Sequence, residues 1–427
     1  MPTDQHATPL TLRQRLVFKA FGVSQRPLMG LMRLLNDPLG HFSNVDRMVR
    51  DPYGLYADIR SHGTVAKSLV PAVCVATGHT AVRQALRQLV VEPPNPAFAW
   101  ESPVNPSLLS LDPPDHTRIR TLVTSAFTPR VVAGMRQLAE QVAGDLLDQA
   151  VSTDGPVDLM RDYASPLPIT MICALMGVPA DDIGRYREWG EAVALSLEVP
   201  TPANRRRIDQ AAQGLQAVFT TEFERRRLDP GDDLISALVH ARDGGDRLSD
   251  RELVATCILI LLAGFETTVN LIGNGTLALL NHPDQRDPLV DDPETVAGPA
   301  VEELLRFDTP VQMTSRYTTE DMAIDGTPVA AGVNVICLLG AANRDPDVFG
   351  NPDVLDLGRS NAREHLAFSA GAHYCLGASL ARLEGEVALA TLFGRYPKLR
   401  QAAPARRRRA QVLRGLETFP VELGPPA

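Results

Sequence analysis

One cysteine of this sequence lies between two glycines, at a position where a helix is expected to begin. The segment reads Phe368-Ser-Ala-Gly371-Ala-His-Tyr-Cys375-Leu-Gly377. Backbone N–H groups and the positive end of the helix would lie near the sulfur of Cys375, and both favour a thiolate over a thiol. Gly371 allows the close approach of a flat ligand, and Gly377 removes a side chain where the helix must pack. A thiolate with one free face is a suitable axial ligand for haem iron.

Other roles for Cys375 are compatible with the same spacing. Free cysteines are commonly buried, so this one could be a structural residue in a tight turn. It could also act as a nucleophile with His373 as its base. Zinc binding is a weaker hypothesis, because His365, His373 and Cys375 lack a fourth ligand at a familiar spacing.

A second unusual segment places an acid and two hydroxyl groups inside an apolar stretch. Residues 263–268 read Ala-Gly-Phe-Glu-Thr-Thr and directly follow the apolar residues 258–262. A carboxylate that only filled the core there would be costly to bury. Gly264 also weakens the helix one turn before Thr267. A proton relay in a dry pocket needs an acid and a hydroxyl of this kind, whereas the alternative is that Glu266 points to solvent.

A third pattern joins an acid and an arginine three residues apart on a predicted helix, at Glu303 and Arg306. Such a pair is usually exposed and contributes little to stability. The same spacing occurs at Glu222–Arg225 and Glu224–Arg227, so the spacing alone assigns no role. The copy at Glu303 differs from the others because it lies just before a proline-containing turn.

The element that must carry Glu266 is predicted to be an unusually long helix. Ser249 and Glu252 form the pattern of a capping box, and no proline follows until Pro283. A helix of about 30 residues would span about 45 Å, enough to cross a large domain. Its most apolar part, residues 253–265, is shorter than the roughly 20 residues that a membrane span needs. We therefore expect a buried core helix and no membrane span.

The remaining pattern predicts a mainly helical protein with small β-sheets at its periphery. A hairpin is expected from residues 65–69 and 72–76, and further helices are expected at 131–150, 215–223, 234–239, 293–307 and 376–393. After Pro310 the chain favours short strands and turns, with strand-like pieces at 412–414 and 419–422. We expect one large domain over residues 41–427, preceded by an N-terminal tail over residues 1–40.

Two readings of the N-terminal tail are open. Residues 10–33 mix apolar and basic side chains, which could form a helix on a membrane surface. Pro27 and Gly30 favour instead a tail that is folded against the body of the protein.

Composition indicates a soluble intracellular protein. The chain has 427 residues, a formal net charge of −9 and 44% hydrophobic residues, which excludes a disordered or fibrous chain. The acidic balance and the 5% of aromatic residues argue against a nucleic-acid partner. Five scattered cysteines without a C-x-x-C pair fit a reducing cytoplasm. Because no secretory signal pattern opens the sequence, we expect a cytoplasmic localisation, and we expect a monomer.

Taken together and in this order, the motifs resemble the cytochrome P-450 family of haem-thiolate monooxygenases, of the soluble bacterial type. Residues 368–377 match F-x-x-G-x-x-x-C-x-G, residues 263–267 match A-G-x-[D/E]-T, and residues 303–306 match E-x-x-R. The glycine that often follows the phenylalanine is Ser369 here. The resemblance covers nearly the whole chain and implies the fold of that family, a triangular prism of helices around a buried haem.

The resemblance also assigns roles to individual residues. Cys375 would be the proximal ligand of haem b, and Glu266 with Thr267 would deliver protons during dioxygen activation. The other residues implied to contact the haem, the first four of them through its propionates, are His116, Arg120, Arg316, His373, Phe368, Gly371, Gly377 and Ala263. A buried structural triad would be formed by Glu303, Arg306 and Arg359.

The substrate pocket above the haem would be largely apolar. By position in the family it would be lined by Phe98, Trp100, Leu262, Ala263, Thr267, Val311, Met313 and Thr418. The segments around residues 95–107 and 180–205 vary most within the family, so the sequence does not identify the substrate.

The resemblance implies a monooxygenase that hydroxylates or epoxidises a hydrophobic small molecule with dioxygen. Electrons would come from NAD(P)H through a separate iron–sulfur ferredoxin and its reductase, because the chain has no spare length or cysteine cluster for a fused reductase. Arg118 and Arg382 are candidates for a basic patch that meets the ferredoxin, whereas the arginine run 406–409 is more typical of a solvated loop. The alternatives are a haem-thiolate peroxygenase or non-oxidative binder, and a thiol-dependent hydrolase.

Overall fold

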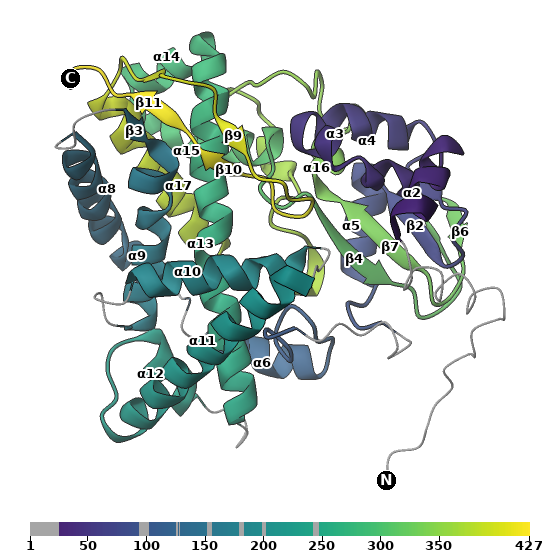
Figure 1. Cartoon of the computed structure of the whole chain (residues 1–427), viewed down its shortest axis with the longest axis horizontal. Helices are drawn as coiled ribbons and strands as arrows, with labels where there is room; N and C mark the ends of the chain where they lie inside the picture. The colour runs from purple at the N-terminus through teal and green to yellow at the C-terminus, as the bar shows by residue number, and fades with distance from the viewer. Residues whose placement is uncertain are drawn as a thin grey trace.

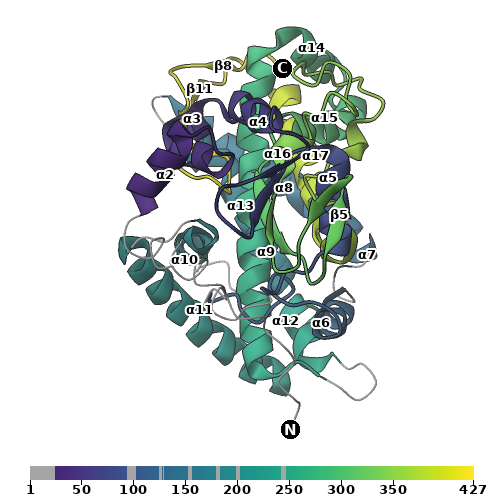
Figure 2. The ribbon, with the colours of Figure 1, turned by 90° about the vertical axis from the view of Figure 1, so that its right-hand side faces the viewer.

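Helix α13 (Asp250–Asn281) runs through the middle of the protein from one end to the other (Figure 2). The computed structural model describes residues 25–93, 102–124, 127, 129–151, 156–178, 183–198, 202–241 and 247–427. Both hydrogen bonds of the capping box between Ser249 and Glu252 are present, and the helix spans 32 residues. The predicted start and length of this helix are therefore confirmed.

Other helices surround α13 and bury it. They are α9 (Pro166–Met176), α10 (Ile183–Ala194), α11 (Pro202–Leu228), α15 (Pro293–Phe307) and α17 (Ala378–Arg395). By length and composition α13 could cross a membrane, but 78% of its apolar window is buried inside the protein, so it is a core helix as predicted. Gly264 has a packing role, because a Cβ at this position would lie 2.6 Å from the side chain of Ile172 on α9.

Shorter helices complete the molecule. They are α2 (Gln25–Leu34), α3 (Val45–Arg50), α4 (Pro52–Arg60), α5 (His79–Gln88), α6 (Asp115–Thr124), α7 (Pro129–Gly134), α8 (Arg136–Val151), α12 (Leu234–His240), α14 (Pro283–Asp291) and α16 (Leu339–Ala342). The helix predicted at residues 131–150 is divided between α7 and α8. Helix α11 is much longer than residues 215–223, because its first half is rich in arginine and glutamine, which hides the apolar period.

The largest sheet lies beside the helical bundle, on the right in Figure 1. It has the strand order β1 (Val65–Lys67), β2 (Val73–Ala76), β7 (Asn334–Leu338) and β4 (Met313–Tyr317). The predicted hairpin β1–β2 is confirmed, and β2 pairs in parallel with β7. A two-stranded hairpin, β5 (Met322–Ile324) and β6 (Thr327–Val329), turns at the predicted Asp325-Gly326.

The chain ends in small strands that cross the helical bundle (yellow in Figure 1). Strand β9 (Arg406–Arg407) pairs with β10 (Leu416–Thr418), and we call residues 406–418 the C-terminal hairpin. Strand β11 (Pro420–Glu422), predicted at 419–422, lies between β3 (Val157–Asp158) and β8 (Arg400–Gln401).

The strand predicted at residues 412–414 is wrong, apart from a single bridge between Leu413 and Val311. The backbone N–H groups of Gln411, Val412 and Leu413 instead donate to the carboxylate of Glu198, at 2.8, 3.0 and 3.1 Å. Glu198 follows the short 3₁₀ helix Leu195–Leu197 at the end of α10, so this contact ties the end of that segment to the tip of the C-terminal hairpin.

The arginine run 406–409 is also not the solvated loop that its composition predicts. Each arginine pairs with an acid: Arg406 with Glu417, Arg407 with Asp308, Arg408 with Glu266 and Arg409 with Asp46. Only the first and last of these arginines are mostly exposed, at 65% and 69% of the side chain. The prediction failed because the acids that bind the two middle arginines come from buried positions far away in the sequence.

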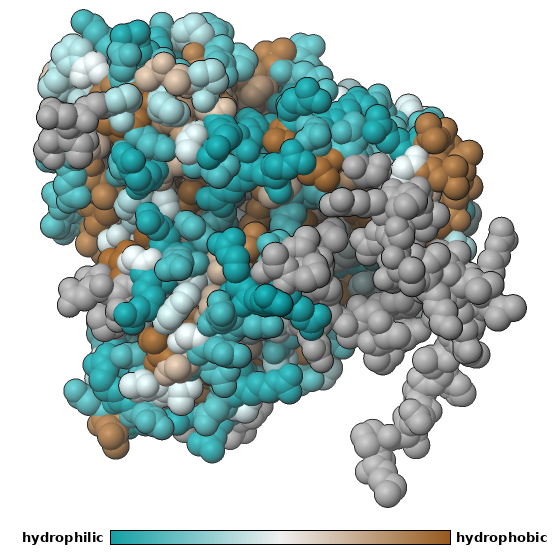
Figure 3. All heavy atoms as spheres, viewed as in Figure 1, coloured by the Kyte–Doolittle hydropathy of each residue, from teal (hydrophilic) through white to brown (hydrophobic). Residues whose placement is uncertain are grey.

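The surface shown in Figure 3 is largely hydrophilic, with a hydrophobic patch at its right-hand edge over α2. The exposed large hydrophobic residues of this part of the chain are Leu31, Leu34, Leu35 and Leu69. Residues 10–24 of the predicted surface helix lie outside the described residues. The division into a tail over residues 1–40 and a domain over 41–427 stays a prediction.

A buried ion pair joins helix α15 to the chain that follows it. The Nε and Nη2 atoms of Arg306 each lie 2.7 Å from a carboxylate oxygen of Glu303, and neither side chain is exposed. Arg359 donates to the same carboxylate at 3.2 Å. Arg306 also donates to three backbone carbonyls between residues 343 and 354. The structure therefore brings together the three residues of the expected triad.

We predict that Glu303→Gln lowers the free energy of unfolding by about 3–5 kcal/mol, because it leaves the Arg306 guanidinium as an uncompensated buried charge. Urea unfolding followed by circular dichroism measures the change. Glu224→Gln is the matched control, since Glu224 has the same spacing to an arginine but is exposed, and we expect a change within about 0.5 kcal/mol. Similar losses in the two variants would contradict the structural role of the buried pair.

Candidate active site

An apolar cavity lies between helix α13 and the segment that carries Cys375. It contains about 1530 Å³ of space that no protein atom fills, part of it open to solvent. Most of the exposed surface of its walls is apolar, which is typical of a site for a ligand that is itself largely apolar. Its apolar walls include Leu108, Phe127, Ile172, Leu259, Ile260, Leu271, Leu305, Val311 and Leu380.

Cys375 lines this cavity from the loop that precedes α17. Its N–H donates to the carbonyl of Phe368 at 2.9 Å, which closes the loop. The Phe368 ring is buried beneath Arg382, whose guanidinium carbon lies 4.5 Å from the ring centroid. Burial raises the pKa of the Cys375 thiol, whereas the N–H of Gly377 and the charges of Arg120 and Arg382 lower it. The other cysteines are all buried: Cys74, Cys173, Cys257 and Cys337.

The two glycines around Cys375 exchange the roles that the sequence predicts. Gly371 has a φ of +72°, and a Cβ there would lie 2.9 Å from the Cα atom of Arg87 on α5. It therefore allows the approach of a helix backbone and not of a flat ligand. An added Cβ at Gly377 would have no protein atom within 4 Å, and this residue lines the cavity. Gly377 therefore leaves space for a ligand.

Basic side chains from three segments form a cluster beside the cavity. Arg120 of α6, Arg316 of β4 and His373 line it, and the ring of His116 lies 4.3 Å from the ring of His373. The buried His116 Nε2 and Arg316 Nε atoms have no hydrogen-bond partner. Burial, with His373 and Arg120 as like charges, lowers the pKa of His116 to about 4. Buried donors without partners are rare in proteins, so this cluster fits an anionic ligand.

These residues fit a haem that is bound through an axial thiolate. Cys375 offers the sulfur, and the apolar walls offer a surface for the macrocycle. Arg120, Arg316 and His373 would hold the propionates, with His116 packed behind His373. Of the other residues implied to contact the haem, Phe368, Gly377 and Ala263 line the cavity.

Helix α13 forms the wall of the cavity that carries a hydroxyl group. Ala263, Gly264, Thr267 and Thr268 line the cavity, and the Thr267 Oγ1 atom donates to the carbonyl of Ala263 at 3.1 Å. This bond to the preceding turn leaves the oxygen of Thr267 able to accept a hydrogen bond from a ligand.

Glu266 lies on a different face of α13, against the C-terminal hairpin. Its side chain is buried with 1% of its surface exposed, so the alternative in which it points to solvent is wrong. Oε1 pairs with Nη1 of Arg408, and Oε2 has no hydrogen-bond partner. The acid and the hydroxyl therefore belong to neighbouring residues, but the Thr267 side chain faces the cavity and the Glu266 side chain faces the C-terminal hairpin.

The predicted substrate contacts are only partly brought together. Ala263, Thr267 and Val311 line the cavity, whereas Phe98 and Trp100 lie outside the described residues. Three predictions are wrong: Leu262, Met313 and Thr418 do not line it. Leu262 packs in the main core at 2% exposure.

The reason for the other two errors lies in the strands. Side chains alternate along a strand, and Thr314 and Arg316 line the cavity from β4, so Met313 faces the opposite side. There it packs against a separate hydrophobic cluster. Thr418 pairs with Arg406 in the C-terminal hairpin.

Several cavity residues were missed from the sequence, although α13 carries a usable signal for some of them. Leu259, Ala263, Thr267 and Leu271 recur every four residues and all line the cavity. Because side chains four apart lie on one face of a helix, extending the spacing from Ala263 and Thr267 predicts the other two. Ile172 and Leu305 come from other helices, and no local pattern marks them.

The alternative chemistries for Cys375 find no support in the geometry. His373 Nδ1 lies 3.1 Å from the carbonyl oxygen of Leu108, and Nε2 lies 3.5 Å from Asp112 Oδ1, so neither nitrogen is directed at the thiol. His365 is buried elsewhere, 3.0 Å from a carboxylate oxygen of Glu302. Within the described part of the chain, no group of three or more His, Cys, Asp or Glu side chains could hold a metal ion.

Comparison with known proteins gives a consistent result. Residues 197–399 match the family model described as Cytochrome P450. Cytochrome P450 140 of Mycobacterium tuberculosis is 40% identical over 424 residues, which cover 95% of this chain and 94% of that protein. Vitamin D(3) 25-hydroxylase of Pseudonocardia autotrophica is 41% identical over 88% of this chain and 94% of its own length.

Solved structures show the same fold. The crystal structure of P450BioI in complex with an acyl carrier protein ligated to hexadec-9Z-enoic acid superimposes with a TM-score of 0.82. The two chains are 36% identical, and the match covers 88% of this chain and 99% of the other.

We predict that Ser369→Gly raises the free energy of unfolding by about 1 kcal/mol. Ser369 has a φ of +64°, a left-handed conformation that strains a side chain but not glycine. Its buried hydroxyl also has no hydrogen-bond partner that would be lost. Urea unfolding measures the change. Ala370→Gly, next to it in extended conformation, is the control and should lower stability by about the same amount. A loss of stability in Ser369→Gly would refute the strain.

Proposed function

The chain belongs to the cytochrome P450 family and is a P450 monooxygenase, and we propose that it inserts one oxygen atom of dioxygen into a hydrophobic small molecule. The observation that carries this proposal is the continuous apolar cavity that has Cys375 on one wall and Thr267 on another. A substrate in this cavity would be bound mainly by the removal of apolar surface from water.

The cofactor of this reaction is a haem b held by Cys375. When bound, a haem with a thiolate ligand supplies the chemistry that cleaves the O–O bond, because the sulfur donates electron density. Arg120 and Arg316 would neutralise the propionates, with His373 beside them, and would fix the orientation of the macrocycle. The role of the protein is to exclude water, to orient the substrate and to supply protons.

Proton supply is assigned to Thr267 and Glu266. Thr267 supplies a hydroxyl on the cavity side of α13, and the residue before it, Glu266, is a buried acid. Members of the family that use peroxide directly, or only isomerise their substrates, often lack this pair. Its presence supports dioxygen activation with external electrons over a peroxygenase.

The substrate class follows from the cavity walls. Apart from the basic cluster, the lining is mostly aliphatic, which favours an extended or polycyclic hydrocarbon skeleton with few polar groups. The hydroxylase from Pseudonocardia autotrophica is named for vitamin D(3), a molecule of this kind.

Electrons are proposed to come from NAD(P)H through a separate ferredoxin and its reductase. The enzyme is proposed to be a monomer in the cytoplasm. Of the predicted basic contacts for the ferredoxin, Arg118 pairs with Glu252 and Arg382 lies 2.7 Å from Glu302. Their side chains stay 26% and 30% exposed. Both guanidinium groups are therefore partly accessible to a partner protein, and each is already paired with an acid.

The proposal is tested by reconstitution with a ferredoxin, its reductase, NADPH and isotopically labelled dioxygen, on hydrophobic substrates chosen by their spectral shift on binding. We expect one labelled oxygen atom in the product and no product when ferredoxin is withheld. The reduced wild type with carbon monoxide should show the red-shifted Soret band of a haem thiolate. Cys375→Ser should lose this band and the activity. A colourless protein, or product made only from peroxide, would refute the proposal.

We predict that Thr267→Ala uncouples the enzyme, because the proton-holding hydroxyl on the cavity wall is lost. NADPH consumption should continue while most of the electrons appear as hydrogen peroxide instead of product. Peroxide and product are measured per NADPH consumed. Thr267→Ser keeps the hydroxyl and should retain most of the coupling. Tight coupling in Thr267→Ala would remove this residue from the relay.

A further inference from the structure

We propose that Arg408 is a positioning residue that holds the Glu266 carboxylate outside the cavity and forms the solvent-side start of proton delivery to Thr267. This inference rests on the proposed function, which needs protons in the cavity. It assigns a role to a residue that lies 142 positions from Glu266 in the sequence, in the arginine run 406–409.

The ion pair between the two residues connects the interior to the surface. Glu266 is 1% exposed, whereas 30% of the Arg408 side chain is accessible to solvent. Oε1 of Glu266 binds Arg408, and Oε2 is a buried oxygen without a hydrogen-bond partner. A buried carboxylate oxygen in this condition can accept a proton or a water molecule.

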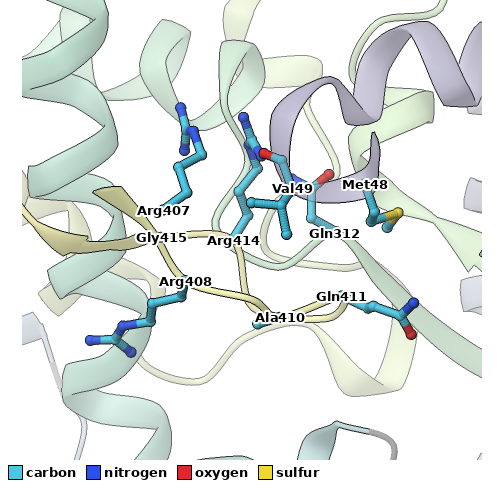
Figure 4. A pocket seen from close by; sticks show the side chains of 9 residues that line it. All are labelled: Met48, Val49, Gln312, Arg407, Arg408, Ala410, Gln411, Arg414 and Gly415. Atoms are coloured by element: carbon cyan, nitrogen blue, oxygen red, sulfur yellow. The ribbon is translucent and has the colours of Figure 1, made fainter. Parts of the chain in front are cut away.

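The C-terminal hairpin fixes the position of Arg408. Its N–H donates to the carbonyl of Gly415 across the hairpin at 3.1 Å. Arg407 in β9 and Arg414, just before β10, both pair with Asp308, at 3.1 and 2.6 Å. Figure 4 shows Arg407 and Arg414 extending to one side of the strand and Arg408 to the other. The guanidinium of Arg408 is therefore directed at α13 by a hairpin that is anchored from its opposite side.

The face of α13 that meets the C-terminal hairpin is polar. Glu266, Asn270 and Asn274 follow each other at intervals of four residues, and Asn274 bonds both Arg407 and the carbonyl of Arg414. Neither amide atom of the fully buried Asn270 has a hydrogen-bond partner. Buried amide groups without partners in proteins are usually satisfied by ordered water, so we infer that this contact is hydrated.

A hollow beside the C-terminal hairpin gives water a place to enter. It is partly open to solvent and has room for about one water molecule (Figure 4). Its walls are polar and basic on the hairpin side, where Arg407, Arg408, Gln411 and Arg414 line it. Arg408 thus belongs both to this solvent-accessible hollow and to the ion pair with the buried acid.

The charges around Glu266 oppose one another. Burial raises the pKa of Glu266, Arg408 lowers it, and Glu191 on α10 raises it. Removing the positive charge of Arg408 therefore moves the pKa upward, so that the acid becomes neutral at a higher pH. In the wild type Arg408 keeps the Glu266 carboxylate charged, and turned toward the hairpin, down to a lower pH.

The proton balance of the relay follows from this arrangement. A proton from the hydrated hollow binds the Glu266 carboxylate and neutralises it, which weakens the pair with Arg408. The neutral acid turns toward the cavity and donates the proton to the hydroxyl oxygen of Thr267, which passes its own proton into the cavity. Glu266, charged again, returns to Arg408. Adjacent residues of a helix point about 100° apart, so the acid needs only a side-chain rotation.

The first test uses infrared titration of the haem-loaded protein, with the carboxylic acid band that Glu266→Gln removes. We expect the midpoint of this band to rise by at least about one pH unit in Arg408→Gln, a tenfold change in proton affinity. Arg408→Lys should stay closer to the wild type. Arg409→Gln is the matched control, because Arg409 is the next residue and its pair with Asp46 is exposed on both sides. We expect no resolvable shift there.

The second test is turnover with ferredoxin, reductase and NADPH over a range of pH. In Arg408→Gln the pH profile of product formed per NADPH should move upward by the same amount as the infrared midpoint, with substrate binding unchanged. Arg409→Gln should keep the wild-type profile.

Each unfavourable outcome has a distinct meaning. An infrared midpoint that is unchanged in Arg408→Gln, or equally shifted in Arg409→Gln, overturns the proposed control of Glu266. A shifted midpoint with an unshifted pH profile overturns the role in proton delivery. A wild type that forms no product refutes the proposed function itself, whereas the infrared titration still decides whether Arg408 holds Glu266.

Discussion

A buried helix can carry polar side chains only where another element supplies their partners, and α13 imposes this condition on much of the molecule. Its 32 residues are covered on most sides by apolar packing. The face with Glu266 and Asn274 is an exception, and the C-terminal hairpin meets it with arginines from a different part of the chain. The hairpin must in turn be neutralised by acids such as Asp308.

The arginines of the C-terminal hairpin and Arg316 on the cavity wall differ in their partners, and this difference distinguishes a structural role from a ligand-binding role. The arginines of the C-terminal hairpin each have an acid within reach, in keeping with the rule that a buried charge needs compensation. Arg316 is also buried, yet its Nε atom has no partner, and burial lowers the pKa of this guanidinium. An uncompensated cation on a cavity wall is explained by a ligand that supplies the missing negative charge.

Local signals in the sequence predicted a large part of the fold. The capping box at Ser249, the absence of proline over the next 30 residues and the four-residue spacing of apolar side chains are properties of a single helix, and they located α13 correctly. The site was predictable where one segment carries it, as for Cys375 and Thr267 on the cavity wall. The location of these residues is determined by the residues next to them in the sequence, so a local pattern is enough to predict it.

The errors arise where a residue's role depends on a distant partner or on the phase of an element. Leu262 differs from the lining residue Ala263 only by one step around the helix, and Met313 from Thr314 by one step along a strand. Gly371 and Gly377 are identical residues whose roles depend on whether α5 or the cavity lies opposite. The composition of residues 406–409 is that of a solvated loop, and nothing near them in the sequence reveals the acids that bind them.

The contact of Glu198 with the C-terminal hairpin has a consequence for the order in which the protein is completed. The carboxylate of Glu198 holds three N–H groups that lie more than 200 positions later in the chain. A ribosome therefore releases the connection between α10 and α11 long before the residues that tie it down exist. Until residues 411–413 have been synthesised, the Glu198 carboxylate lacks these three partners.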